Sequence, residues 1–396
     1  MQDLYHYYRT VFAGLPRPFA FIDRDNLQTN IQDIIQRAAP VAIRIATKSI
    51  RCLPVIKHIL QSSPAFKGGM TFSAAETVWL SKKGIDNLLI GYPQTDEAAL
   101  TAVAVEIKSG KSITCMIDKM EHVELLNRIG KKENVVIPVC IDVDMSIDYP
   151  GLHFGVWRSS LKNMNDVRDL VKQIAALPNI RISGLMGYEA QIAGVGDNVP
   201  GKIIKNNIVR TLKKNSVKQI AERRQQIVDM LKDLNIAIEF VNGGGTGSIE
   251  STKKEATVTE ITVGSGFFQS HLFDNYSNFK HEPAAIFGLE ISRNPSPGIY
   301  TCHGGGYIAS GAAGNDKLPL PYLPGEMELF AMEGTGEVQT PFRYKGNQQL
   351  NIGDTVFFRH AKAGELCERF IFLYVISDGK IVDKYPTYRG EGQCFL

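Results

Sequence analysis

The sequence predicts an α/β protein, a (β/α)8 TIM-type barrel followed by a C-terminal β domain. From about residue 41 to residue 266, short apolar runs alternate with longer amphipathic segments, a pattern typical of βα units and a parallel sheet. Eight such runs over about 225 residues fit the size and order of a barrel. Beyond Phe267 the chain is rich in glycine, proline and short alternating strands. A doubly wound open sheet is the alternative that the number of strands leaves open.

The barrel strands are expected in apolar runs that begin at Val41, Met70, Asn87, Ser112, Val135, Ile180, Ile238 and Val258. The second of these runs is MTFSA, residues 70–74. Amphipathic segments between the runs predict helices, for example over residues 96–108, 119–129 and 215–234. In the last segment apolar residues recur at helical spacing, at Val217, Ile220, Ile227, Met230 and Leu231.

The predicted domains are an N-terminal segment (1–40), the barrel (41–275) and a C-terminal β domain (276–396). The early run FAFID, residues 19–23, would be a ninth strand in a barrel of eight. We therefore expect it to pair with the C-terminal β domain, whose own strands are predicted in GIYTCHGGGYIASG, TVFFRHA and RFIFLYVISDGKIV.

The overall composition favours a small-molecule partner. The 44 basic and 41 acidic residues of the 396-residue chain nearly cancel, which argues against a nucleic-acid or membrane-surface partner. No stretch approaches the roughly 20 apolar residues that span a bilayer, and the N-terminus does not resemble a secretion signal. The six cysteines are scattered without a CxxC pair, so reduced thiols in the cytoplasm are expected.

One lysine stands at the end of the first predicted barrel strand, in RIATKSIRC. In barrels of this kind the functional groups lie at the carboxyl ends of the strands. Taken alone, Lys48 is an exposed strand-end lysine. A desolvated lysine amine is also a nucleophile that forms Schiff bases with carbonyl groups.

Two glycine-rich turns follow the seventh and eighth strands, NGGGTGSIE (242–250) and VGSG (263–266). Phosphate groups commonly bind at these two positions of a barrel. Glycines let the backbone approach an anion closely, and exposed N–H groups point toward it. A lysine across the barrel mouth from a phosphate site therefore indicates a Schiff base with pyridoxal phosphate.

RIATKSIRC resembles the cofactor-lysine strand of the alanine racemase-like (fold type III) pyridoxal phosphate enzymes. The likeness is to their D-threonine aldolase and D-serine dehydratase branch, and especially to bacterial amino acid aldolase or deaminase proteins. It extends through FAFIDRDNLQTNI, GLMGYEAQIAG, NGGGTG, VGSG and GDTVFFRHAKAGELCERF, and thus covers nearly the whole chain. The resemblance implies a barrel with a C-terminal β domain, a homodimer, and pyridoxal 5'-phosphate bound as an aldimine on Lys48.

The resemblance also implies which residues surround this cofactor. Arg158 is similar to an arginine at the edge of the ring, and Asp142 and Asp144 are expected to orient it. Taken alone, Arg158 is equally well a surface residue and Tyr188 a core aromatic. The remaining predicted cofactor-binding residues are Tyr188, Gln191, Asn242, Gly244, Gly245, Thr246, Ser265 and Gly266.

A divalent metal, Zn or Mn, is a further implication of the resemblance. In this branch a histidine and a second ligand two residues later hold a metal that binds the substrate hydroxyl. His360 matches the histidine, but Lys362 stands where the second ligand belongs. Cys367 is the predicted replacement ligand, and a structural role for both His360 and Cys367 is the alternative.

Three functions follow as hypotheses. The first is a lyase acting on a D-3-hydroxy amino acid, by retro-aldol cleavage or by dehydration and deamination, with Lys48 and His360 as catalytic residues. The second is an amino-acid racemase of the alanine racemase type. A racemase needs a second base opposite Lys48, and Tyr307 is the one candidate. The third, a non-catalytic pyridoxal phosphate-binding protein, leaves the long C-terminal domain without a role.

Overall fold

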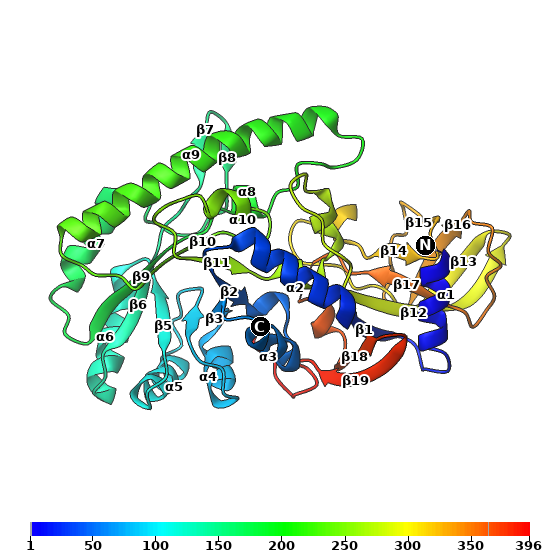
Figure 1. Ribbon diagram of the computed structural model, residues 1–396, viewed down its shortest axis with the longest axis horizontal. Helices are drawn as coiled ribbons and strands as arrows, with labels where there is room; N and C mark the ends of the chain where they lie inside the picture. The colour runs from blue at the N-terminus through cyan, green and yellow to red at the C-terminus, as the bar shows by residue number, and fades with distance from the viewer. Residues whose placement is uncertain (1, 363) are drawn as a thin grey trace.

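The computed structural model describes residues 2–362 and 364–396, which form two parts (Figure 1). The first part is a closed barrel of parallel strands, in the order β10-β11-β2-β3-β4-β5-β6-β9. The second is a large sheet built from the C-terminal third of the chain and one N-terminal strand. The predicted barrel with a C-terminal β domain is therefore confirmed, and closure of the barrel excludes the open-sheet alternative.

The barrel strands among the described residues occur where the apolar runs predict them, with one exception. They are β2 (Ala42–Ala46), β3 (Phe66–Thr71), β4 (Leu88–Ile90), β5 (Ile113–Ile117), β6 (Ile137–Asp142), β9 (Ile180–Gly187), β10 (Phe240–Gly243) and β11 (Glu260–Val263).

The exception is β3, which lies about four residues before the run predicted for it. Glycine weakens a strand interior, so FKGGMT does not look like a strand in the sequence. Glycine is needed there because the Asn87 carbonyl oxygen lies 2.0 Å from where a Cβ of Gly68 would stand. Ser73, predicted within the strand, instead caps the following helix by accepting a hydrogen bond from the Glu76 N–H at 3.2 Å.

Helices cover the outside of the barrel. They are α2 (Arg24–Ala38), α3 (Leu53–Ser62), α4 (Ala74–Lys82), α5 (Glu97–Lys108), α6 (Met120–Glu133), α7 (Met164–Ile174) and α9 (Ile203–Asp233). The predicted helices at 96–108 and 119–129 are confirmed as α5 and α6. The shorter elements are η1 (Thr47–Ser49), α8 (Ala190–Ala193), α10 (Ile249–Thr252), α11 (Ser265–Phe268), η2 (His271–Asn275) and the hairpin of β7 (Ile147–Tyr149) and β8 (Leu152–Phe154).

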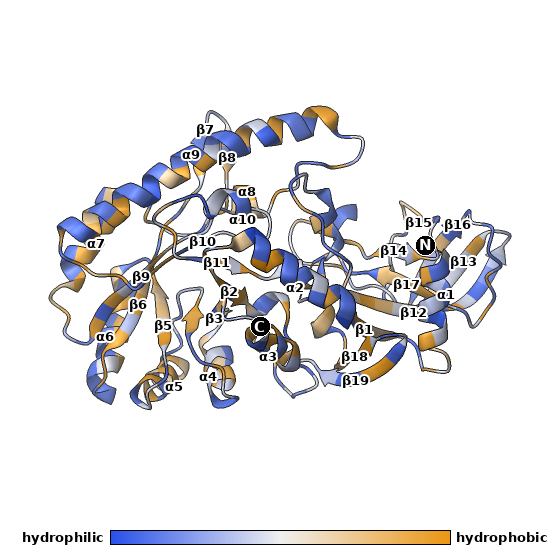
Figure 2. Ribbon diagram, viewed as in Figure 1, coloured by the Kyte–Doolittle hydropathy of each residue, from blue (hydrophilic) through white to orange (hydrophobic). Residues whose placement is uncertain are grey.

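Helix α9 begins twelve residues before its predicted start. Its C-terminal half buries Ile220, Ile227 and Leu231, as the apolar spacing predicts. Its N-terminal end exposes Ile203 and Ile204, and Figure 2 shows this end in orange. The added turns have no apolar stripe facing a core, so periodicity does not detect them. Within the part of the chain that the structure describes, none of the helices is both long and apolar enough to cross a membrane.

The C-terminal part is a mostly antiparallel sheet. Its main path runs β15-β16-β13-β12-β1-β18-β19, with β14 and β17 attached through β12. The bounds are β1 (Phe19–Asp23), β12 (Ala285–Ser296), β13 (Ile299–His303), β14 (Leu320–Leu323), β15 (Met327–Leu329), β16 (Gln339–Tyr344), β17 (Thr355–Arg359), β18 (Phe372–Ser377) and β19 (Lys380–Pro386). Two short 3-10 turns lie between these strands. The turn η3 (Asn315–Lys317) lies between β13 and β14, and η4 (Leu366–Glu368) lies between β17 and β18.

Strand β1 pairs with β12 on one side and β18 on the other, so the N-terminal FAFID lies inside this sheet. Helix α1 (Gln2–Val11) packs on the same sheet, and its Tyr8 hydroxyl donates a hydrogen bond to Asp23 at 2.8 Å. Asp23 also caps α2 by accepting from the Asn26 N–H at 3.1 Å. Since α2 covers the barrel, the segment from β1 to α2 joins the sheet to the barrel (Figure 1).

The interior of the barrel is packed in its middle. A buried cluster of strand residues fills the middle, comprising Leu89, Met116, Cys140, Met186 and Phe240. Beside it the guanidinium of Arg44 forms an ion pair with Glu260 at 2.8 Å, and both side chains are almost fully buried. The Asn242 amide donates to the same carboxylate at 2.8 Å.

Candidate active site

A pocket opens at the carboxyl ends of the barrel strands. The empty space between its atoms, open solvent included, is about 720 Å3. Eight of the predicted site residues line it, namely Lys48, Arg158, Tyr188, Asn242, Gly244, Gly245, Thr246 and Ser265. Four lie outside its lining, namely Gln191, Gly266, His360 and Cys367.

Lys48 reaches the pocket because the chain turns sharply after β2. Residues 47–49 form the 3-10 turn η1, and the Thr47 hydroxyl anchors this turn by donating to the Met70 carbonyl of β3 at 3.0 Å. Thr47 and Ser49 are buried, whereas Lys48 is exposed to the pocket. The Lys48 ammonium donates a hydrogen bond to the Tyr92 hydroxyl at 2.7 Å.

Tyr92 is a pocket residue that the sequence reasoning missed. It follows β4 by two residues, at the strand end where barrel proteins place functional groups. The guanidinium of Arg158 lies 5.0 Å from the centre of its ring. Burial raises the pKa of Tyr92, but the nearby charges of Lys48 and Arg158 outweigh burial, and the net pKa is lowered. The sequence signal that could have identified Tyr92 is its position at the end of the predicted strand NLLIGY.

Arg158 is held in the pocket by two partners. Its Nε donates to Asp142 at 2.7 Å and one terminal nitrogen donates to the Gly91 carbonyl at 2.8 Å. Burial raises the pKa of Asp142 to about 7, against the opposing effect of Arg158. Asp142 thus contacts Arg158 directly, whereas Asp144 accepts from the Ser146 N–H at 2.8 Å.

Tyr188 also lies near Arg158, with the guanidinium 5.7 Å from the centre of its ring. Burial raises the pKa of Tyr188 to about 12, so this phenol stays protonated. The pKa values of the two tyrosines beside Arg158 are therefore shifted in opposite directions, because only Tyr92 also contacts the Lys48 ammonium.

The two glycine-rich turns lie next to each other in the lining of the pocket. The Gly266 N–H donates to the Thr246 hydroxyl at 3.0 Å and thereby links them. Gly244 has a φ of +79°, a conformation that favours glycine. A Cβ at Gly264 would meet the Ser49 hydroxyl oxygen at 2.7 Å, so the second turn packs tightly on the segment that carries Lys48.

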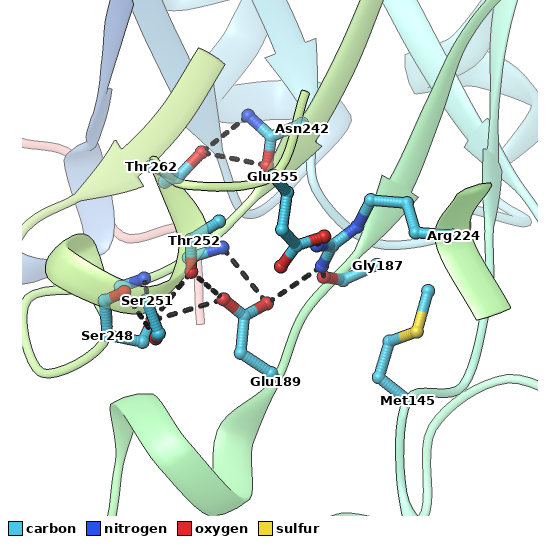
Figure 3. A network of polar contacts seen from close by, with 12 residues as sticks. Met145, Gly187, Glu189, Arg224, Asn242, Ser248, Ser251, Thr252, Glu255 and Thr262 are labelled. Carbon is cyan, nitrogen blue, oxygen red and sulfur yellow. Dashed lines mark hydrogen bonds and ion pairs between the residues drawn. The ribbon is translucent and has the colours of Figure 1, made fainter. Parts of the chain in front are cut away.

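A buried polar network supports the first turn from below (Figure 3). The Glu189 carboxylate accepts from the Gly244 N–H at 3.0 Å and from the Ser248 hydroxyl at 3.1 Å. It also accepts from the Thr252 hydroxyl and pairs with Arg224 of α9 at 3.2 Å. Arg224 is fully buried and extends the network to Glu255 and to the Gly187 carbonyl.

The backbone of the turns leaves donors for an anion. The N–H groups of Gly244 and Gly245 are already bound, to Glu189 and to the Ser248 hydroxyl. In residues 2–362 and 364–396, the N–H groups of Thr246 and Ser265 donate to no other protein group, and both residues line the pocket. Together with the Ser265 hydroxyl, they are donors that an anion in the pocket could bind.

Gln191 is buried on α8 and directs its amide away from the pocket. Its Nε2 donates to the Met145 carbonyl at 2.6 Å. The expected contact of Gln191 with a cofactor therefore has no counterpart in the geometry, because the short helix α8 turns this side chain toward the loop after β6.

His360 and Cys367 lie in different surroundings. His360 is buried beside Arg359 and His271, with its Nδ1 3.2 Å from the Ala285 carbonyl, and burial lowers its pKa to about 3. Burial raises the pKa of the Cys367 thiol. The nearby groups that also influence this pKa are Cys52, Arg51 and Glu368. The Lys362 ammonium donates to the Ser310 hydroxyl at 3.1 Å.

These donors do not form a zinc site. Structural zinc sites use four ligands from the protein and catalytic zinc sites use three. No group of three His, Cys, Asp or Glu side chains suited to a metal occurs within residues 2–362 and 364–396. His360 offers one nitrogen, its Nε2, and a lysine occupies the position two residues later.

The fold and the pocket define a (β/α)8-barrel protein whose site lies at the strand ends between a lysine and two glycine-rich turns. A family model described as "Alanine racemase, N-terminal domain" matches residues 22–271. The chain therefore belongs to the alanine racemase-like family, as its motifs predict.

Curated relatives match a part of the chain. A 3-hydroxy-D-aspartate aldolase of Paracoccus denitrificans (strain Pd 1222) is 23% identical over 257 residues, which are 65% of this chain and 61% of the relative. A D-threonine aldolase of Arthrobacter sp is 21% identical over 228 residues, 58% of this chain and 54% of the relative. The matches thus span about three fifths of these relatives' length.

Solved structures show the same fold over nearly the whole chain. D-threonine aldolase from Filomicrobium marinum superposes with a TM-score of 0.80 at 17% identity, covering 95% of this chain and 96% of that chain. D-threo-3-hydroxyaspartate dehydratase from Delftia sp. HT23 gives 0.75 at 16% identity, with 94% and 98% covered. At these low sequence identities, the structural similarity shows a shared fold and no more.

Proposed function

We propose that the protein is a pyridoxal phosphate-dependent lyase that acts on a D-3-hydroxy amino acid. The observation that carries this proposal is the pocket that contains both Lys48 and the two glycine-rich turns. The names of the relatives, aldolases and a dehydratase of D-hydroxy amino acids, support a lyase.

The pocket residues fit this cofactor. The free N–H groups of Thr246 and Ser265 suit a phosphate, because backbone donors bind such an anion without a side-chain cation. Lys48 supplies the amine that bonds to the cofactor's aldehyde carbon. Arg158, fixed by Asp142, adds a positive charge beside Tyr92 and Tyr188.

Pyridoxal phosphate, when bound, supplies the electron sink for the pair left at the substrate Cα. The residues of the chain hold and move the protons. Lys48 is the base and acid at Cα, the role that the resemblance implies for it. Asp142 keeps Arg158 in place, and the turns hold the anionic end of the cofactor. No step is assigned to His360 or Cys367, since both lie outside the pocket lining.

A racemase remains the second candidate. It requires a proton donor on the face of Cα opposite Lys48. Tyr307 packs between Phe287 at 5.1 Å and Phe370 at 5.4 Å, measured between ring centres. It does not line the pocket of its own chain, so it is not placed to be that donor within one subunit. The homodimer stays a prediction, which light scattering tests.

Borohydride reduction of the purified protein tests the central claim. The expected result is a pyridoxyl group on the Lys48 peptide, with no label in a Lys48→Ala variant. A protein that contains the cofactor and is labelled at another lysine would contradict the proposal. Lys57, on α3, serves as the matched control, and Lys57→Ala should label as the wild type does.

Product analysis separates the lyase from the racemase. D-Threonine and D-serine are supplied to the wild type and to Lys48→Ala. A lyase releases an aldehyde or a keto acid, whereas a racemase produces the L-amino acid alone. The first result supports the proposal and the second replaces it with the racemase.

A further inference from the structure

The backbone that leads into Tyr92 is anchored beside the pocket. The Gly91 N–H donates to the Thr71 carbonyl at 2.8 Å, and the Gly91 carbonyl accepts from Arg158 at 2.8 Å. A Cβ at Gly91 would meet the Met70 side chain at 2.8 Å. The backbone before Tyr92 is thus fixed on two sides, and the phenol lies beside Lys48 at 2.7 Å.

The charges around this phenol set it apart from the other tyrosines. Lys48 donates to its oxygen, and the Arg158 guanidinium lies near its ring. Ten other tyrosines in the described chain have a shifted pKa, and in each of them the pKa is raised, with burial as the largest cause. For Tyr92 the two cations outweigh burial. The pocket therefore stabilises the phenolate of this residue.

We propose that Tyr92 is the base that removes the β-hydroxyl proton of a D-3-hydroxy amino acid, and that its hydrogen bond to Lys48 returns this proton to Cα. The inference rests on the proposed lyase function and concerns retro-aldol cleavage. A proton on a hydroxyl group needs a base near it, and the surroundings of His360 and Cys367 do not fit a metal that would do the same work.

The atoms and electrons balance in this scheme. The hydroxyl O–H bond breaks toward the Tyr92 oxygen, and the carbon that carried the hydroxyl becomes a carbonyl. The Cα–Cβ bond breaks and leaves its electron pair at Cα. Lys48 gives Cα a proton, and Tyr92 gives Lys48 the proton that it took, across their 2.7 Å contact. One aldehyde and one shorter amino acid leave, and both residues return to their starting states.

The first test is a Tyr92→Phe variant of the holoenzyme, assayed with D-threonine. Removing a general base lowers kcat by about 10²–10⁴-fold. Borohydride labelling of Lys48 should persist in this variant, which shows that it folds and binds the cofactor. Exchange of the glycine α-proton with deuterium oxide, which needs Lys48 but has no hydroxyl step, should also persist. A Tyr300→Phe variant, altered where Tyr300 stacks on Phe342 in the C-terminal sheet, should cleave D-threonine like the wild type.

Two further readouts do not depend on loss of activity. Ultraviolet difference titration should show one tyrosine fewer ionising below pH 10 in Tyr92→Phe than in the wild type. Replacing Tyr92 by a fluorinated tyrosine keeps the ring and lowers its pKa, so the acid limb of the kcat profile should move to lower pH.

Unchanged kcat in Tyr92→Phe, or an acid limb that the fluorinated residue does not move, would overturn the role of Tyr92. These results leave the lyase function standing when wild-type Lys48 is labelled and an aldehyde is released. Absence of the label or of any cleavage in the wild type would instead contradict the proposed function itself.

Discussion

The carboxylate of Glu189 accepts a hydrogen bond from the backbone N–H of Gly244 at 3.0 Å. A negative charge thus lies directly under a turn that we assign to an anion. Arg224, which pairs with Glu189 at 3.2 Å, balances this charge from within helix α9. Because the Glu189 carboxylate holds Gly244 and Ser248, the free Thr246 N–H between them is presented to the pocket.

A Glu189→Gln variant should weaken pyridoxal phosphate binding. The amide cannot accept from all the donors around Glu189, and a buried donor left unsatisfied costs about 1–3 kcal/mol. We expect a Kd about tenfold higher, equivalent to about 1.4 kcal/mol, in absorbance titrations of the apoprotein. Glu328→Gln, on the exposed ion pair with Lys345, is the control. Equal affinities of the two variants for pyridoxal phosphate would show that the Glu189 network does not contribute to binding.

The buried ion pair of Arg44 and Glu260 should matter for stability. Glu260→Gln leaves a buried guanidinium without its counter-charge, a loss of roughly 3–5 kcal/mol, which urea unfolding measures. The comparison variant is Glu239→Gln, since Glu239 pairs with Arg181 at the surface and exposed pairs contribute less than about 1 kcal/mol. Similar losses of stability in both variants would contradict the larger contribution that we expect from the buried pair.

Glu76 should make stability depend on pH. Complete burial raises its pKa from 4.5 to about 7, although the Phe72 N–H and the Tyr388 hydroxyl both donate to it. Between these values the folded protein keeps a proton that the unfolded chain has lost. The free energy of unfolding therefore falls as pH rises from 4.5 to about 7, by about 3 kcal/mol.

Urea unfolding at a series of pH values checks this effect. The Glu76→Gln variant cannot titrate and should lose this part of the pH dependence. Glu222→Gln, at an exposed position of α9, should retain it. An identical pH profile in wild type and Glu76→Gln would show that Glu76 is ionised in the folded protein.

Chelation should leave the lyase activity unchanged. His360 offers one nitrogen, and Lys362 occupies the position two residues later, so the described donors do not form a metal site. The measurement is D-threonine cleavage before and after dialysis against a chelator, with metal content determined by mass spectrometry. Activity that is lost and then restored by Zn or Mn would support a metal bound through His360.

Much of the barrel could be predicted from the sequence because its strands are short apolar runs between amphipathic helices. Strand β3 could not, since Gly68 is needed to make room for the Asn87 carbonyl, a contact between neighbouring strands. The extra turns of α9 were missed for a related reason, because Ile203 and Ile204 face solvent and form no stripe.

The sequence by itself determined the family, the barrel with its β domain, and the strand ends at which Lys48 and the glycine-rich turns lie. These features depend on local patterns and on the rule that parallel strands end on one face. Tertiary structure alone decided that Lys48 contacts Tyr92, that Glu189 supports Gly244, and that Gln191 turns away from the pocket. Such contacts join residues distant in the chain, and their geometry depends on how the strands close into the barrel.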